Sequence, residues 1–364
     1  MGLISQAADR ILNTTAAAPP PVRPEVLAFH RSLPVVDLLV GTVLFRRSFM
    51  RRLGHGHVDL PRLREGGVDL IGLSIATRFP DLRGTLSAPH FRSLGMPRKA
   101  LGSGMAIAEW LVQRIEGWAA ASAGGLKVVR DAAGLEGRPR ADGSVGAFIG
   151  VQGGHVLDGD ARNVERLHAL GVRMLAPAHV MDNELVGSGT GARAGGLTPF
   201  GREVVAECER LGIAVDLAHM SSAGIRDTVP LLRRPFLLSH TGLRSLAGGR
   251  SRWRRYSPAT RNVGDDDLRL VAEAGGVVGL TLSTQLLGGS SMETLVRAFA
   301  RAIELMGPER VAIGSDFDGA LRMPFDVTGL PALTQALLDA GFGSEVVAGV
   351  MGGNALRQLR AARP

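Results

Sequence analysis

The sequence predicts an α/β protein whose main unit is one (β/α)8 barrel of the TIM type. Three observations predict it: eight short apolar runs rich in β-branched residues, amphipathic helical stretches between them, and no shift in composition that would divide the 364 residues. Runs that are apolar on both faces are typical of parallel strands covered by helices. Eight such strands alternating with helices close into a barrel.

The elements follow one another in a regular order. Residues 1–33 are expected to form an N-terminal helical extension broken by three prolines, and residues 34–364 a single barrel with C-terminal helices. A long helix is expected over 98–120, and shorter helices before the fourth, fifth, seventh and eighth strands, several of them ending at glycine. The expected strands are residues 34–40, 68–77, 145–154, 171–180, 212–221, 234–242, 275–283 and 311–319.

Composition limits the cellular context. There is one cysteine, Cys208, which cannot form an internal disulfide, and no apolar run of 18 or more residues that would span a membrane. The first residues lack a basic start followed by an apolar segment, so no secretory signal is expected. We therefore predict a cytoplasmic protein without a membrane partner.

The net charge of +8 invites a nucleic-acid interpretation. The basic residues are almost all arginines and are spread along the chain, which argues against a binding surface. One dense cluster, SRWRRYSPATRN at 251–262, is more typical of a solvated or oligomer-facing loop. We predict no nucleic-acid partner and keep a basic binding module as a minor third hypothesis.

Polar residues end most of the expected strands. They are Gln152 in the third strand, His179 in the fourth, His219 in the fifth, His240 in the sixth, and Asp316 with Asp318 in the eighth. Polar groups at the carboxyl ends of barrel strands face one cavity, and each must be satisfied there. A single histidine at such a place is more often a hydrogen-bonded core residue, but four such polar residues on neighbouring strands predict a shared site.

The chain resembles the membrane (renal-type) dipeptidase family of zinc peptidases, from about residue 30 to 358. This resemblance implies a metallo-dependent hydrolase-like barrel with two zinc ions that cleaves dipeptides, and a homodimer. The segments that carry it are HVDLPRLREGGV (57–68), VQGGHVL (151–157), LGVRMLAPAH (170–179), GLTPFGREVVAECERLGIAVDLAHMS (196–221), FLLSHTGLRSL (236–246), RNVGDDDLRLVAEAGGVV (261–278), GPERVAIGSDFDG (307–319) and MGGNALRQLR (351–360).

Carried over position by position, the resemblance implies a role for five residues. His219 and His240 match the histidines that hold the second zinc. His179 matches the histidine that polarises the scissile carbonyl, Arg261 the arginine that orients the substrate, and Asp316 the aspartate that handles the proton.

Three of the five principal metal ligands of the family are lost. Aligned on Val36-Asp37, the family's His-x-Asp pair falls on Leu39 and Gly41, and its bridging glutamate is Gln152. The asparagine that usually follows the strand-four histidine is Val180. Zinc needs three or four donors and a bridge between two cations needs an anionic oxygen, so the first metal is not expected.

One zinc at most is therefore expected, held by His219 and His240 with Gln152 as a weak ligand and Asp316 able to approach. Replacement of the lost pair by His55 or His57 is the less favoured interpretation.

Two hypotheses about function follow. The first is a divergent hydrolase with at most one metal, acting on a dipeptide, a related small amide or a lactone-like substrate. The second is a metal-free protein on the same barrel, either a binding or partner protein or a non-hydrolytic biosynthetic enzyme such as an isomerase, because fold does not fix function.

Overall fold

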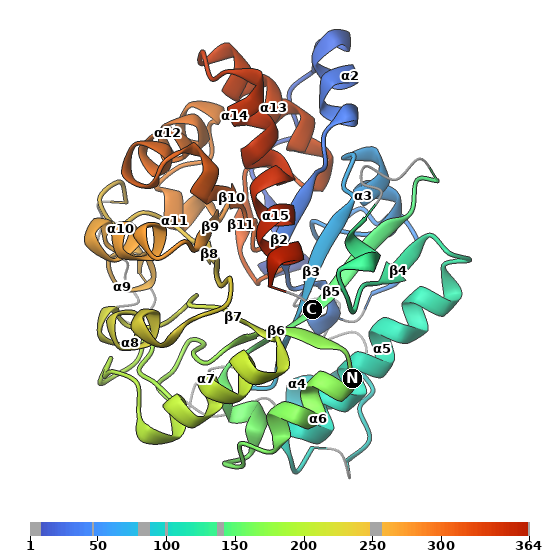
Figure 1. Ribbon diagram of the computed structural model, residues 1–364. Helices are drawn as coiled ribbons and strands as arrows, with labels where there is room; N and C mark the ends of the chain where they lie inside the picture. Colours follow the sequence, from blue (N-terminus) through green and yellow to red (C-terminus); the bar gives the residue numbers. More distant parts are fainter. Residues whose placement is uncertain are drawn as a thin grey trace.

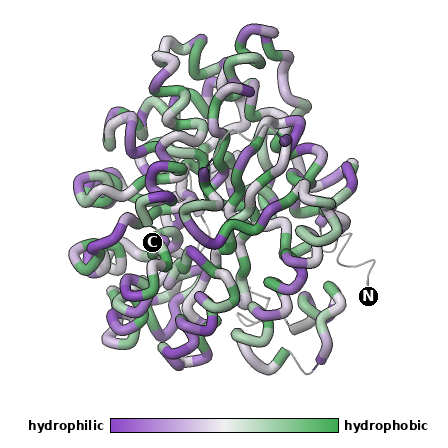
Figure 2. The backbone as a smooth tube through the Cα atoms, turned by 45° about the vertical axis from the view of Figure 1, so that its right-hand side comes forward, coloured by the Kyte–Doolittle hydropathy of each residue, from purple (hydrophilic) through white to green (hydrophobic). Residues whose placement is uncertain are grey.

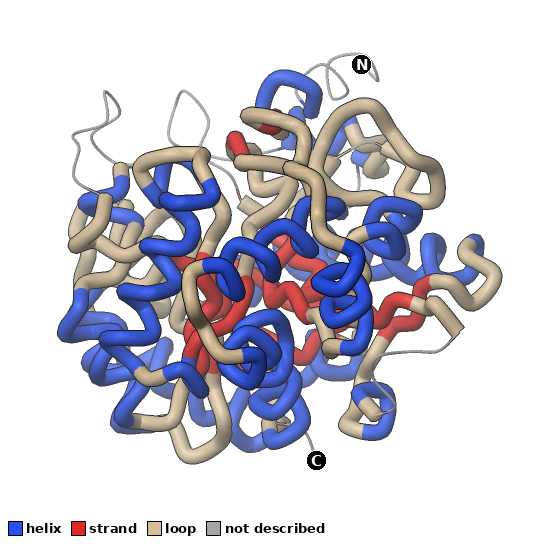
Figure 3. The backbone as a smooth tube through the Cα atoms, turned by 90° about the horizontal axis from the view of Figure 1, so that it is seen from above, coloured by secondary structure: helices blue, strands red, loops and turns tan. Residues whose placement is uncertain are grey.

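The computed structural model describes residues 9–45, 47–78, 88–98, 101–136, 142–247 and 257–362. Parallel strands surround one axis and helices cover them on the outside (Figures 1 and 3). The eight strands of the ring are β2 (Val36–Val40), β3 (Leu70–Ala76), β5 (Val145–Gln152), β6 (Val172–Ala176), β7 (Ala214–Val215), β8 (Leu237–Thr241), β9 (Val277–Leu280) and β10 (Val311–Ile313).

The strand order is β7-β6-β5-β3-β2-β10-β9-β8, and every pairing is parallel. A single parallel bridge between Asp216 and Leu237 joins β7 to β8 and completes the ring. The (β/α)8 barrel is confirmed, and each of the eight expected runs contains one of its strands. The strands are shorter than the apolar runs because the ends of the runs turn into the loops of the barrel mouth.

Helices alternate with the strands and pack around the ring (Figure 1). Figure 2 shows hydrophobic residues toward the interior and hydrophilic residues on the outer turns. The helices are α2 (Pro24–Ser32), α3 (Leu60–Glu65), α4 (Ala88–Ser93), α5 (Gly104–Ala121), α6 (Asn163–Ala169), α7 (Pro199–Leu211), α8 (Ser222–Thr228), α9 (Pro258–Arg261), α10 (Asp265–Glu273), α11 (Thr284–Leu287), α12 (Met292–Met306), α13 (Leu330–Asp339), α14 (Ser344–Ala348) and α15 (Asn354–Ala361).

Local sequence explains where these helices begin and end. The Thr198 side chain accepts a hydrogen bond from the Gly201 N–H at the start of α7, and Gly212 ends that helix with φ 71°. The left-handed φ at this position favours glycine. Ser291 caps α12 in the same way through the Thr294 N–H. Such caps contribute about 1 kcal/mol each and fix the entry to the next strand.

The N-terminal extension is joined to the barrel at several places, two of which involve β1 and α2. Residues 14–15 (β1) pair with residues 322–323 (β11), and His30 Nδ1 on α2 lies 2.8 Å from Thr334 Oγ1 on α13. The sequence did not indicate β1, β11 or β4 (Leu126–Val128), which adds to β5 outside the ring. The division at residue 33 stays a prediction.

The structure bears only in part on the expectations of no nucleic-acid partner and no membrane partner. The arginines and aromatics of the basic cluster, residues 251–256, lie outside the described residues. Among the residues that are described, no helix combines the length and apolar character needed to cross a bilayer.

Candidate active site at the mouth of the barrel

The barrel brings the expected polar residues to its carboxyl end. Gln152 ends β5, His179 follows β6, His219 follows β7, His240 lies in β8, and Asp316 follows β10. Arg261 closes α9 nearby. All six side chains are buried.

His219 and His240 form the centre of the site. Their Nε2 atoms are 3.0 Å apart, and the His179 ring lies 4.8 Å from the His219 ring, centroid to centroid. His219 has a positive φ of 65°, which turns the chain sharply after β7. Strained backbone of this kind is common at functional sites.

A hydrogen-bonded chain fixes the orientation and tautomer of His240. Ser239 Oγ donates to Asp216 Oδ2 at 2.6 Å, so it accepts from His240 Nδ1 at 2.8 Å. In the neutral ring the Nε2 lone pair then faces His219. A histidine held through Nδ1 in this way is suited to bind a metal through Nε2.

Arg261 and Asp316 add charge to this centre. Arg261 Nη2 lies 3.3 Å from His219 Nε2 and donates to the His240 carbonyl oxygen at 3.1 Å, while its Nε and Nη1 are buried without a partner among the described residues. Asp316 Oδ2 is 3.9 Å from His240 Nε2. Burial raises the pKa of Asp316 to about 7, so this carboxyl can hold or release a proton near neutrality.

Burial also keeps the histidines neutral. It lowers the pKa of His179 to about 3, and it lowers the pKa values of His219 and His240 well below 6.5, with Arg261 adding to the effect. Neutral imidazoles can bind a metal or donate one hydrogen bond.

The first-metal position of the family does not fit an ion. Leu39 is fully buried among apolar residues, and its backbone groups bond to Asp37 and Asp316. A Cβ on Gly41 would lie 2.5 Å from the Asp318 carbonyl oxygen, so no carboxylate can be accommodated there without a backbone shift. Gln152 is neutral, and its Nε2 donates to Ser74 Oγ at 2.7 Å.

His57 and His55 do not replace the lost pair. His57 is fully buried, its Nδ1 accepts from the Asp318 N–H at 3.0 Å, and its Nε2 lies 3.0 Å from the Thr14 carbonyl oxygen. His55 Nε2 lies 3.5 Å from Asp9 Oδ2. Both belong to a network of charged side chains that fastens the N-terminal segment to the loops after β2 and β10.

That network includes a well-defined ion pair. Arg47 Nη2 lies 2.8 Å from both Asp9 Oδ1 and Asp318 Oδ1, and Thr42 Oγ1 donates to Asp318 Oδ2 at 2.6 Å. Burial opposes ionisation of Asp318, but Arg47, His57 and Thr42 together hold its pKa below the usual range. Asp318 is therefore a structural anion, unlike Asp316.

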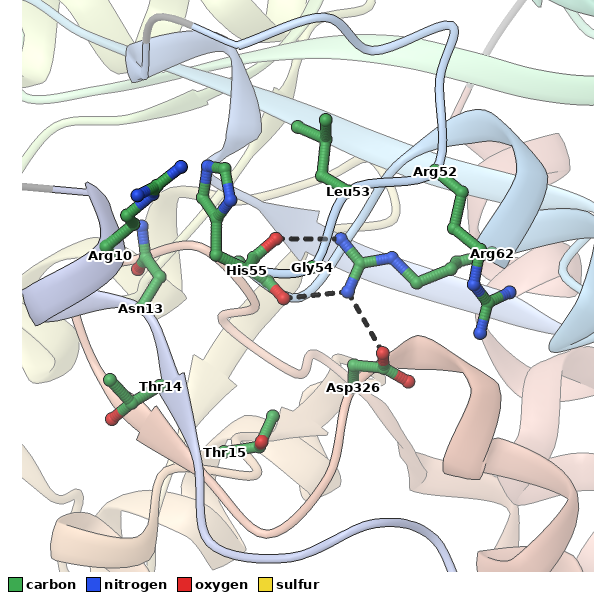
Figure 4. A pocket seen from close by; sticks show the side chains of 11 residues that line it. Arg10, Asn13, Thr14, Thr15, Arg52, Leu53, Gly54, His55, Arg62 and Asp326 are labelled. Atoms are coloured by element: carbon green, nitrogen blue, oxygen red, sulfur yellow. Dashed lines mark hydrogen bonds and ion pairs between the residues drawn. The ribbon is translucent and has the colours of Figure 1, made fainter. Parts of the chain in front are cut away.

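A polar pocket of about 510 Å³ lies beside this network, between residues 10–15 and 52–56 (Figure 4). The Arg62 guanidinium on its wall donates to the His55 and Gly56 carbonyl oxygens and to Asp326. None of the predicted site residues lines it.

The second-metal position fits an ion only in part. His219 and His240 provide two convergent donors, and Gln152 Oε1 is buried with no partner among the residues that the structure describes. In the described parts of the chain, no group of three or more His, Cys, Asp or Glu side chains is arranged to hold a metal. A cation there would depend on a neutral amide oxygen or on movement of Asp316.

Comparison with known proteins identifies the family. The profile of membrane dipeptidases (peptidase family M19) matches residues 24–363. The chain belongs to this family. Its curated relatives include dipeptidase aclJ of Aspergillus oryzae, 34% identical over 227 residues, and dipeptidase 3 of Rattus norvegicus, 32% identical over 247 residues.

These two matches cover 60% and 65% of this chain but only 51% and 48% of the relatives, so the similarity spans about half their length. A solved family structure is similar nearly end to end. The metallopeptidase from Rhodobacter sphaeroides, liganded with a phosphinate mimic of the dipeptide L-Ala-D-Ala, is 27% identical with a TM-score of 0.75, over 91% of this chain and 99% of that one. The family is one of metallopeptidases, and the barrel is its fold.

Sequence reasoning missed the residues that support the site. Asp216 and Ser239 orient His240, while His155 and Thr77 carry buried polar atoms without described partners. The available signal was the charged residue inside an apolar run, VDL at 215–217, which also occurs at 36–38. A buried aspartate on a strand must have donors close by.

Proposed function

We propose that this protein is a hydrolase that acts on a dipeptide or a related small amide with at most one zinc ion. The observation that carries the proposal is the His219–His240 pair, with Nε2 atoms 3.0 Å apart and Asp316 beside it in a family of dipeptidases. The zinc would bind to these two histidines, with the Gln152 amide oxygen as a weak third donor. When bound, zinc polarises a carbonyl and acidifies a water molecule.

The residues of the chain would do the rest. Arg261, whose Nε and Nη1 have no partner among the described residues, would supply positive charge and N–H donors to the substrate carboxylate. Neutral His179 has one N–H, which is bonded to the Arg78 backbone, and would donate it to the scissile carbonyl oxygen in exchange for that bond. Asp316, with a pKa raised by burial to about 7, would take a proton during attack and return it to the leaving amine.

The metal-free alternative has one specific observation in its favour. The Arg261 guanidinium lies 3.3 Å from His219 Nε2, so a positive charge already occupies part of the space near the metal-binding nitrogens. In that alternative the protein is a binding or partner protein or a non-hydrolytic enzyme, and its site binds a small anionic ligand. Cytoplasmic location, a homodimer and a small-molecule or dipeptide ligand remain proposals on either view.

Metal content tests the proposal. Purified protein offered zinc should hold about one equivalent by plasma mass spectrometry, because the site offers one chelating pair. His219→Ala should lose it together with turnover of a dipeptide panel. His30→Ala, which removes a buried histidine from α2, is the matched control and should keep it. No bound zinc in the wild type would favour the metal-free alternative.

A further inference from the structure

Three buried polar atoms on the β3–β5 side of the mouth have no hydrogen-bond partner among the described residues. They are Thr77 Oγ1, Gln152 Oε1 and His155 Nε2, on residues that are 1%, 5% and 3% exposed. Buried polar atoms are normally satisfied by protein, by water or by a ligand, because leaving them unpaired is unfavourable. Three on one side of the barrel mouth point to a ligand there.

The three residues lie at or just after the carboxyl ends of β3 and β5. The β3–β5 register pairs Ala76 with Gln152, so Thr77 and Gln152 lie at the ends of adjacent strands. The backbone of Arg78, next to Thr77, is hydrogen-bonded to His179. A Cβ on Gly153 would meet His155 Nε2 at 2.5 Å and His179 Cβ at 3.2 Å, so the His155 ring and the His179 Cβ lie against that glycine.

The chemistry of this flank is neutral. Thr77, Gln152 and His155 bring a hydroxyl, an amide and an imidazole, with no carboxylate among them. The positive charge of Arg78 is close enough to act on His155, and that of Arg261 acts on His179. A ligand ammonium group would therefore lose hydration without gaining a counter-charge. An uncharged amide can donate to Gln152 Oε1 and accept from a hydroxyl or imidazole N–H.

We infer that Thr77, Gln152 and His155 form an amide subsite, which selects dipeptides whose amino end is uncharged, as in an N-acyl dipeptide. The inference rests on the proposed function, since Arg261 is taken to bind the carboxylate at the other end of the same ligand. It gives Gln152 Oε1 a substrate partner in place of the weak zinc contact of the proposed function, so a zinc ion would then depend on His219 and His240. The family's bridging glutamate is Gln152 in this chain, and on this inference that difference changes which substrates the site prefers.

A matched pair of ligands tests this. Binding of N-acetyl-Ala-Ala and Ala-Ala to the full chain is measured by isothermal titration calorimetry, with chromatography in parallel to show whether either is cleaved. The blocked dipeptide should bind at least about tenfold tighter, as expected for one or two recovered hydrogen bonds.

Variants then assign the preference to the subsite. Gln152→Leu should reduce it to within about twofold, because the acceptor is gone. Gln152→Glu should reverse it in favour of Ala-Ala, whose ammonium gains a carboxylate. Gln358→Leu is the matched control: Gln358 is a buried glutamine whose Nε2 donates to the Phe236 and Gly275 carbonyl oxygens away from the mouth, and its removal should leave the preference intact. If Gln152→Leu does not fold, Thr77→Val replaces it in the test, and this variant should weaken the binding of N-acetyl-Ala-Ala but not that of Ala-Ala.

Four outcomes would overturn the inference. The wild type could bind the two ligands equally, prefer Ala-Ala, or bind neither ligand. The preference for the blocked dipeptide could also survive in Gln152→Leu, which would mean that Gln152 Oε1 does not bind the ligand. Failure of the proposed function is distinguishable. A preference for the blocked dipeptide without cleavage of either ligand would leave the subsite standing and remove the hydrolase. Cleavage of Ala-Ala with no preference would do the reverse.

Discussion

The barrel contains two strand junctions built on the same plan that carry different chemistry. At the junction of β7 and β8, Asp216 Oδ1 accepts from the Ala218 and Ser239 N–H groups and its Oδ2 from Ser239 Oγ. At the junction of β10 and β2, Asp37 Oδ1 accepts from the Leu39 and Ser315 N–H groups and its Oδ2 from Ser315 Oγ. Both aspartates begin the tripeptide Asp-Leu-(Ala or Leu) after a valine.

The residues placed by these two junctions differ. Three positions after Asp216 stands His219, whereas three positions after Asp37 stands Val40. The residue after the serine is His240 in one junction and Asp316 in the other. The hydrogen-bonded support is thus present at both junctions, while a pair of histidines is present at only one. The support of the backbone therefore does not depend on the histidines, because the β10–β2 junction forms without them.

The largest expected effect comes from removing the supports themselves. Asp37→Ala and Asp216→Ala each leave two backbone N–H groups and a serine hydroxyl buried without an acceptor, so each should lower the free energy of unfolding by about 4 kcal/mol. Urea denaturation measures this. Only Asp216→Ala should also lower zinc affinity, because it alone releases His240. Equal loss of zinc in both variants would show that the junctions act together.

Truncation of the residues carried by the junctions should separate stability from binding. Leu39→Ala removes a fully buried side chain and should cost about 3 kcal/mol while zinc content stays unchanged. His219→Ala should change stability by about 1 kcal/mol or less and abolish zinc binding. Denaturation curves and plasma mass spectrometry on both proteins check the contrast, and a loss of zinc in Leu39→Ala would contradict it.

Restoring the family residues should not restore the first metal. The triple variant Leu39→His, Gly41→Asp, Gln152→Glu puts a Cβ at residue 41 about 2.5 Å from the Asp318 carbonyl oxygen. We expect about 2 kcal/mol of destabilisation from this overlap and no second zinc equivalent. The double variant that keeps Gly41 is the control and should be the more stable of the two. Two zinc ions in the triple variant would show that the loop at Asp318 can move.

The remaining effect is a pH dependence of stability. Burial raises the pKa of Asp37 to about 7, from an unfolded value near 3.8, and it also raises the pKa of Asp216. Between about pH 4 and 7 the folded state holds a proton on Asp37 that the unfolded state lacks, so this contribution to stability is lost as pH rises through 7. Asp37→Asn removes the contribution.

Stability of Asp37→Asn should consequently rise more steeply than that of the wild type between about pH 4 and 6.5, by about one proton or 1.4 kcal/mol per pH unit. Asp216→Asn should change the slope in the same direction. Denaturation midpoints over that pH range check both variants, and parallel curves for wild type and Asp37→Asn would show that the Asp37 carboxyl is ionised in the fold.

Much of the fold was predictable because the apolar runs are long and regular. The runs around β3, β5 and β8 are buried on both faces, and helices such as 199–211 carry clear caps. β1 and β11 were not predictable, because two-residue strands leave no pattern and their pairing joins residues 14–15 to 322–323.

The site was predictable in its histidines and less so in its supports. His219 and His240 end apolar runs, so their position at the mouth follows from the barrel. The hydrogen bonds of Asp216 and Asp37 depend on which strands are neighbours in the ring. That is a property of the closed barrel, and the linear sequence does not contain it. The overlap at Gly41 likewise depends on a loop nearly 280 residues further along the chain.

The two junctions are joined by few strand pairs, so the ring is expected to open locally there first. β7 and β8 share a single bridge, and β10 and β2 share one ladder pair and one bridge, so these junctions divide the ring into a five-stranded and a three-stranded sheet. Amide protons there, such as that of Leu217 bonded to the Leu237 carbonyl, should exchange with solvent before those of the β3–β5 ladder. A ligand that contacts both His219 and His240 would join the two sides of the β7–β8 junction, so its binding would be visible as slower exchange of the amide protons along that junction, including ones that the ligand does not contact.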